Sequence, residues 1–256
     1  MKQLNRLHVN QDQLVGSWCN SDAVVSCAME AVSFITPVVE RFFIRTVAQA
    51  LVRQHAPELG RCARKFMLEE ANHARAHRRF NAALFAYLGS APPGLAMARW
   101  LLAAASQRMS LSNRLLLAAT LEHFSAVLSR RYLLYEDRWS FCSSFAKTLF
   151  AQHAREELAH RAVAFDLWRS RSTDGRRRRF AALLAVLILA WAYLAVAVPW
   201  ILYRKSGRRL SRALVHLTKF IGAPRSKSPG SSPVGELFLF TRLDFHPRLL
   251  PFESPL

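Results

Sequence analysis

The chain has 256 residues and a formal net charge of +19, from 36 Lys and Arg against 17 Asp and Glu. Its 9 glycines are few, and alternating β-branched runs between turn dipeptides are absent, which argues against a sheet. The four cysteines form no Cys-x-x-Cys pair and no disulfide-like spacing, which favours a reducing compartment. The N-terminus lacks an apolar core for a cleavable signal peptide. The sequence therefore predicts an all-α protein.

The first predicted helix carries a carboxylate in an apolar setting. Residues 1–35 are expected to form an irregular lead-in, and Pro37 is typical of a first helical position. The helix is predicted from Pro37 to about Gln54, and its apolar stripe lies next to Glu40. A carboxylate within an apolar surface is costly unless a partner such as a metal ion compensates its charge.

Three more long helices and one short helix are predicted up to residue 168. Gly89 and the Pro92-Pro93-Gly94 run end the second helix, and Ser110 is a suitable N-cap for the third long helix. The predicted ranges are Pro57–Leu88, Leu95–Gln107 for the short helix, Leu111–Tyr135 and Phe141–Trp168.

Two of these helices carry a Glu-x-x-His unit, formed by Glu70 with His73 and by Glu157 with His160. Residues three apart on a helix leave the same face. Two such units, with one further Glu from each of two other helices, form the ligand set of dinuclear carboxylate sites in four-helix bundles. The predicted metal ligands are therefore Glu40, Glu70, His73, Glu122, Glu157 and His160.

The order of these ligands along the chain predicts the topology. A single Glu precedes each Glu-x-x-His unit, which indicates two helical hairpins joined by a crossover between Gly89 and Ser110. This order matches the ferritin-like bundle, which we expect for residues 36–174. A site of four carboxylates and two imidazoles suits two divalent ions, and favours Fe or Mn over a closed zinc site.

Other acidic and histidine side chains lie near the predicted ligands. His77 and His153 share the metal-facing side one turn away, so they are candidate catalytic bases, extra ligands or ordinary buried histidines. Glu69 and Glu156 lie about 100° away around their helices, which favours solvated or ligand-supporting roles. His123 is expected to point away from the site. The predicted surface histidines are His8, His55 and His216.

A long apolar segment follows this region. Four arginines, at 176–179, precede 24 uncharged residues from Phe180 to Tyr203, which is long enough to span a bilayer. Basic residues flank both ends, so the sequence does not choose an orientation, and a buried helix or a hairpin dipping into one leaflet remains open. Residues 210–221 form a basic amphipathic helix, so 175–222 is predicted to associate with the membrane.

The last predicted region, 223–256, consists of a flexible linker and a tail. The linker reads APRSKSPGSSPVG, and the apolar tail from Glu236 to Glu253 is expected to dock onto the rest of the chain. The positive charge favours an anionic membrane surface as partner, on the cytoplasmic side of the inner membrane. No nucleic-acid recognition motif accompanies the charge, so no specific nucleic acid is expected. The alternative explanation of the charge is neutral enrichment in arginine, as occurs in genomes of high GC content.

Several segments resemble a known family, the bacterial predicted metal-dependent hydrolases with a ferritin-like helical fold. They are ERFF at 40–43, FMLEEANHARAHRRFN at 66–81, HAREELAHRAVAFDLW at 153–168 and FHP at 245–247. The resemblance covers roughly residues 33–169 and the C-terminal FHP segment at 245–247. Val39 departs from the family pattern, in which a glycine precedes the glutamate.

The resemblance implies a metal-dependent hydrolase, and the apolar segment suggests a lipophilic or membrane-delivered small-molecule substrate. The carboxylate-rich ligand set is also close to that of ferritin-like di-iron oxidases and oxygenases, which use O₂. A non-catalytic, membrane-anchored metal-binding protein is a further alternative. The oligomeric state stays open.

Overall fold

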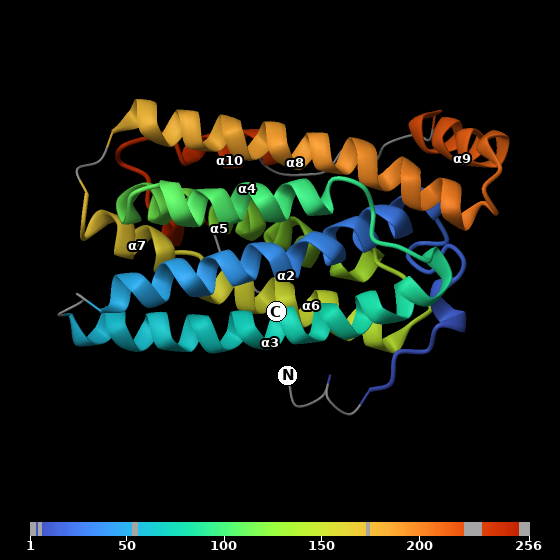
Figure 1. Cartoon of the computed structure of the whole chain (residues 1–256), viewed down its shortest axis with the longest axis horizontal. Helices are drawn as coiled ribbons and strands as arrows, with labels where there is room; N and C mark the ends of the chain where they lie inside the picture. Colours follow the sequence, from blue (N-terminus) through green and yellow to red (C-terminus); the bar gives the residue numbers. More distant parts are fainter. Residues whose placement is uncertain (1–3, 5–6, 53–55, 173–174, 223–231, 251–256) are drawn as a thin grey trace.

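A computed structural model describes residue 4 and residues 7–52, 56–172, 175–222 and 232–250 (Figure 1). Within these residues the protein is all-α, which confirms the predicted fold class, and the extended pairing is limited to a bridge between Cys19 and Phe141. The helices are α2 (Ala23–Leu51), α3 (Pro57–Leu88), α4 (Leu95–Arg108), α5 (Leu111–Leu134), α6 (Ser144–His160), α7 (Val163–Arg169), α8 (Arg176–Lys205), α9 (Leu210–Gly222) and α10 (Pro233–Leu239). Short 3₁₀ turns occupy Asp12–Leu14, Glu136–Arg138 and Pro247–Leu249.

Four helices pack around a common centre. The hairpin of α2 and α3 lies against the hairpin of α5 and α6, so that α2 contacts α5 and α3 contacts α6. Helix α8 runs along α2 and α5, on the side of the molecule drawn at the top of Figure 1. Helix α3 lies at the opposite edge of that view. The α2–α5 side and the α3–α6 side are therefore opposite faces of the four-helix core.

The first helix begins 14 residues before the predicted start, so the prediction that it starts at Pro37 was wrong. Asp22 caps it by accepting hydrogen bonds from the backbone N–H groups of Val24 and Val25. Proline inside a helix leaves the carbonyl four residues earlier without its donor. That carbonyl belongs to Ser33, and Nδ2 of Asn81 donates to it at 2.9 Å. A side chain from α3 thus replaces the missing bond.

The next three helices match the predicted ranges to within a residue. Gly89 ends α3 with a φ of 76°, and Ser110 caps α5 by accepting from the N–H of Asn113. The predicted helix 141–168 was wrong as one element, because α6 ends at His160 and α7 begins at Val163. This break frees the backbone N–H of Ala164, which donates to Oε2 of Glu122 at 3.1 Å.

The C-terminal segment docks onto α5, α7 and α8, as expected from its apolar residues. Phe240 and Phe245 are buried, and both pack against the ring of His123. Nε2 of His246 lies 2.7 Å from Oδ1 of Asp166 on α7. Most of the predicted linker, 223–231, lies outside the described residues. The division of the chain into domains stays a prediction.

Candidate metal centre

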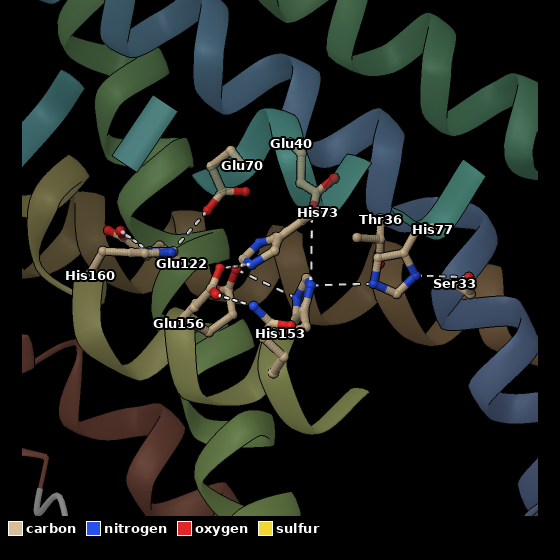
Figure 2. A network of polar contacts seen from close by, with 12 residues as sticks. Ser33, Thr36, Glu40, Glu70, His73, His77, Glu122, His153, Glu156 and His160 are labelled. Carbon is tan, nitrogen blue, oxygen red and sulfur yellow. Dashed lines mark hydrogen bonds and ion pairs between the residues drawn. The ribbon is translucent and has the colours of Figure 1, made fainter. Parts of the chain in front are cut away.

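The side chains of all six predicted ligands meet inside the four-helix core, as Figure 2 shows for most of them. Glu40 comes from α2, Glu70 and His73 from α3, and Glu122 from α5. The remaining two are Glu157 and His160 from α6. These side chains form two groups, and within each group the ligand atoms all lie within 4.8 Å of one another. The first group is Glu70, His73, Glu157 and His160, and the second is Glu40, His73 and His153.

The separations between these ligand atoms are longer than hydrogen bonds. Nε2 of His160 is 3.4 Å from Oε1 of Glu70, and its Nδ1 is 3.8 Å from Oε1 of Glu122. In the second group, Oε1 of Glu40 is 3.7 Å from Nδ1 of His73 and 3.8 Å from Nδ1 of His153. The carboxylate and imidazole groups therefore gather around shared positions without hydrogen-bonding to each other through these atoms.

Buried oxygen and nitrogen atoms that lack hydrogen-bond partners show whether a cation fits between these side chains. Both carboxylate oxygens of Glu40 and of Glu70 are buried and accept no hydrogen bond. One oxygen of Glu122 and one of Glu157 are in the same state, and so are both ring nitrogens of His160. Buried polar atoms in native proteins almost always have partners. These residues therefore fit metal ions. They do not form a set of buried polar side chains that satisfy one another by hydrogen bonds.

The electrostatics of the carboxylates agree with this conclusion. Burial raises the pKa of Glu40 well above its usual range, and the nearby Glu157 carboxylate raises it further. The pKa of Glu70 and that of Glu122 are raised by the same two causes. Burial also raises the pKa of Glu157, although His73 acts in the opposite direction. A cation between these groups would favour their ionised forms.

A hydrogen-bonded chain fixes the ring of His153. The hydroxyl of Ser33 donates to Oδ1 of Asn81 at 2.7 Å, so its oxygen accepts from Nδ1 of His77 at 2.8 Å. Nε2 of His77 is then an acceptor, and it lies 3.3 Å from Nδ1 of His153. Nδ1 of His153 consequently carries the proton. Its unprotonated Nε2 faces Oε1 of Glu157 at 3.5 Å, as expected of a metal-ligating imidazole.

Glu156 fixes the ring of His73 in a similar way. Its Oε2 accepts from Nε2 of His73 at 2.7 Å, and its Oε1 accepts from Gln152 at 2.8 Å. Burial acts to raise the pKa of Glu156, but these hydrogen bonds outweigh it and the pKa is lowered. Nδ1 of His73 is left without a hydrogen-bond partner and faces Glu40. Of the roles predicted for Glu156, supporting a ligand is the one that the contacts favour.

The histidines predicted to lie off the site do so where the structure describes them. Nε2 of His123 lies 3.1 Å from the backbone carbonyl of Glu236, away from the ligands. His8 and His216 are exposed, and His55 lies outside the described residues. The sequence reasoning missed Ser33 and Asn81, because polar residues at those positions have no spacing that marks them as partners of a distant histidine.

The centre has one partly exposed margin, between α3 and α6. The side chain of His153 is 16% exposed and that of Glu156 is 22% exposed, whereas Glu70 and Glu122 are fully buried. Glu69, on the neighbouring part of α3, is 21% exposed and pairs with Lys65 at 3.6 Å. The centre therefore comes into contact with solvent along this margin.

Binding of a divalent ion is expected to release protons at neutral pH. The raised pKa values of Glu40, Glu70 and Glu122 favour the protonated carboxyl in the metal-free protein, and coordination requires the carboxylate. Burial lowers the pKa of His77 and of His160 to about 3, so these rings are neutral and release nothing. The affinity for the ion should therefore fall as the pH falls from 8 to 6.

Calorimetric titration with Mn²⁺ in two buffers of different ionisation enthalpy measures the number of protons released. Equal heats in both buffers would contradict this prediction. A Glu122→Gln variant should release fewer protons than the wild type.

The fold and the site thus define an all-α protein with a buried Glu and His cluster suited to metal ions. The family model described as "Predicted metal-dependent hydrolase" matches residues 3–249, and the chain belongs to this family. The match confirms the resemblance seen in the sequence and extends it over nearly the whole chain. The chain matches no curated protein and no solved structure.

Proposed function

We propose that this protein is a hydrolase that uses two divalent metal ions held in a ferritin-like four-helix bundle. The observation that carries the proposal is the group of buried carboxylate oxygens without hydrogen-bond partners. Membership of the predicted metal-dependent hydrolase family supports the reaction class. The neighbouring pairs α2–α3, α5–α6, α2–α5 and α3–α6, with the long crossover through α4, agree with a ferritin-like arrangement.

The residues divide between two metal positions. Glu70, Glu157 and His160 would hold one ion, with Glu122 close to His160. Glu40 would hold the other together with His153, which offers its unprotonated Nε2, and His73 lies within reach of both groups. Mixed carboxylate and imidazole ligands in this number suit Fe or Mn. Of the roles that the sequence left open for His153, namely catalytic base, extra ligand or ordinary buried histidine, this division takes that of an extra ligand.

Metal ions in such a pair supply Lewis-acid chemistry that activates water and polarises a substrate oxygen, and redox-active ions also supply reduction of O₂. The protein contributes a largely buried surrounding lined in part by aromatic rings. The ring of Phe66 packs on His160 at 4.8 Å between centroids, and Phe150 packs on His77 at 5.7 Å. Glu156 holds the proton of His73 at Nε2, so that Nδ1 keeps its lone pair toward Glu40.

An O₂-using oxidase or oxygenase is the second candidate, because a carboxylate-rich set with two Glu-x-x-His units is the one that di-iron proteins use. The third is a non-catalytic metal-binding protein. A lipophilic or membrane-delivered substrate gains no support from the position of the exposed margin. That margin lies between α3 and α6, whereas the apolar helix α8 packs against α2 and α5. We therefore propose a substrate that arrives from water.

The proposal is tested with full-length protein purified under reducing conditions and loaded with Mn²⁺ or Fe²⁺. Elemental analysis should find about two ions per chain. The Glu70→Ala/Glu157→Ala double variant, prepared in parallel, should retain almost none. Assays with ester, amide and phosphoester substrates should show turnover in the Mn²⁺-loaded wild type and none in the variant.

Each other outcome selects a different function. Uptake of O₂ by the Fe²⁺-loaded protein with a new absorption band, and no hydrolysis, would favour the oxidative candidate. Bound metal without either activity would favour the non-catalytic candidate. Equal and low metal content in the wild type and the double variant would overturn the metal centre itself.

A further inference from the structure

The outward face of α8 is apolar from Phe180 to Val196. Its inner face is buried on the core through Leu183, Val186, Tyr193, Ala197 and Ile201. The outer face carries Phe180, Leu184, Ile188, Leu189, Trp191 and Val196, which are 44–68% exposed. A helix on the surface of a soluble protein normally presents polar residues on its outer side. The outer face of α8 therefore fits an apolar partner.

Neighbouring elements widen this face. Met97 and Trp100 on α4 are each 58% exposed, and Leu210, Leu214 and Val215 on α9 are exposed as well. Figure 1 places α4, α8 and α9 on the same side of the molecule. Exposed large apolar side chains gathered on neighbouring elements are typical of an interaction site.

Helix α8 is attached to the core at its start, its middle and its end. Arg179 donates to backbone carbonyls of the C-terminal segment, at 2.7 Å for the shortest bond. The hydroxyl of Tyr193 donates to the carbonyl of Ala31 at 2.9 Å. At the end of the helix, Nζ of Lys205 lies 2.6 Å from Oε1 of the buried Glu30. These contacts keep α8 parallel to the core over its whole length.

This attachment decides how a bilayer can cover α8. A helix of 30 residues is about 45 Å long, so crossing a bilayer would bring the attached side of the core into the hydrocarbon. The C-terminal segment bonded to Arg179 carries Arg242 and Asp244, which are 60% and 70% exposed, and such charged side chains are costly to bury in hydrocarbon. The outer face can instead lie on the surface of one leaflet, parallel to the membrane plane. Helix α2 is also long and apolar enough to cross a membrane, but half of it is buried inside the protein.

Charge distinguishes a bilayer from a second copy of the chain. The sequence from Arg176 to Gly222 contains ten Lys and Arg residues and no Asp or Glu. Arg176 and Arg177 are exposed before the apolar face, and Arg208 and Arg209 are exposed after it. A second copy packed through the same face would bring these like charges together. An anionic leaflet attracts them, at about the level where lipid headgroups meet the apolar face.

We propose that the face formed by α4, α8 and α9 docks in the plane of an anionic membrane leaflet, with α8 lying on the leaflet and not crossing it. The apolar residues of α8 enter the region between headgroups and acyl chains, and the basic residues at both ends contact lipid phosphates. This proposal concerns location and does not depend on the reaction that the metal centre performs.

The first test is flotation of full-length protein with vesicles of phosphatidylcholine that contain 30% phosphatidylglycerol. Binding should be at least 10-fold tighter than to pure phosphatidylcholine vesicles, and should weaken as salt is added. A Leu184→Ser/Ile188→Ser double variant should bind at least 10-fold more weakly than the wild type. Leu68→Ser is the matched control, because Leu68 is 64% exposed but lies on α3; it should bind like the wild type.

The depth of Trp191 separates docking in the plane from a true span. This residue is 68% exposed near the middle of α8. Quenching by lipids brominated at different acyl positions, as the difference between wild type and Trp191→Phe, should place the indole near the glycerol level. Circular dichroism and metal content of the Ser variants should match the wild type, which shows that their core is intact.

Three results would overturn the proposal. Strongest quenching at the bilayer centre would show that α8 spans the membrane. A lipid-free dimer in sedimentation analysis that Leu184→Ser/Ile188→Ser abolishes would show that a second copy covers the face. Equal vesicle binding by the wild type and this double variant would show that charge alone recruits the protein.

Discussion

Replacing Glu70 with Gln should weaken metal binding by at least about 100-fold, because substitutions in groups that only support a ligand already cost about 10–100-fold. The residue beside it provides the matched control. Glu69 is 21% exposed, belongs to neither group of ligand atoms and pairs with Lys65. Glu69→Gln should therefore bind metal within a few-fold of the wild type. Competition titrations with a chelating dye measure both variants under the same conditions.

The same substitution should stabilise the metal-free protein. Burial, Glu157 and Glu40 raise the pKa of Glu70, which means that the folded protein resists the charge of this carboxylate. An uncharged amide removes that penalty, so the free energy of unfolding without metal should rise by about 1–3 kcal/mol at pH 8. Denaturant titration in the presence of a chelator measures it. A Glu70→Gln protein that binds metal normally, or that unfolds more easily without metal, would contradict a site selected for a cation.

Replacing Arg179 with Ala should lower the free energy of unfolding by about 3–5 kcal/mol. The guanidinium is fully buried and donates to the carbonyls of Phe240, Arg242 and Phe245. It also lies 4.9 Å from the ring centroid of Phe165. Its removal leaves buried carbonyls without a donor and a cavity between α7, α8 and the C-terminal segment.

Two further variants distinguish this role from a general effect of charge. Arg177→Ala removes an exposed arginine of the same run, and should change stability by less than about 0.5 kcal/mol. Arg179→Lys keeps the charge but lacks the planar guanidinium group that reaches several carbonyls at once. Its stability should therefore fall between that of Arg177→Ala and that of Arg179→Ala. Limited proteolysis should cut the segment 232–250 sooner in Arg179→Ala. Equal stability of Arg177→Ala and Arg179→Ala would contradict the assigned contacts.

Periodicity and spacing were sufficient to predict the helices that carry the ligands. Each Glu-x-x-His unit places its two side chains on one face by helix geometry alone, and Gly89 and Ser110 mark the ends of the crossover through local backbone chemistry. The lone glutamates could be placed because a carboxylate in an apolar stripe needs compensation. The sequence therefore identified the six residues that meet in the core.

Long-range contacts account for what the sequence reasoning missed. Pro37 suggested a helix start, but Asn81, 44 positions later, supplies the donor that lets the helix continue through it. The break after His160 could not be seen in residues with good helix propensity. Arg179 is one of four consecutive arginines in the sequence, and nothing local distinguishes it from the others, yet it is buried. In each case the deciding partner lies on another helix or in the C-terminal segment.

The opposite placement of the α8 face and the exposed margin at His153 and Glu156 makes the molecule two-sided. A protein that rests on a leaflet through one side turns its other side toward the cytosol, if the leaflet is the inner one. Membrane attachment and the metal centre would then be separable by mutation: a change on α8 alters where the protein resides and leaves its metal content intact. Loss of attachment would appear in a cell as misplacement, with fully metal-loaded protein recovered in the soluble fraction.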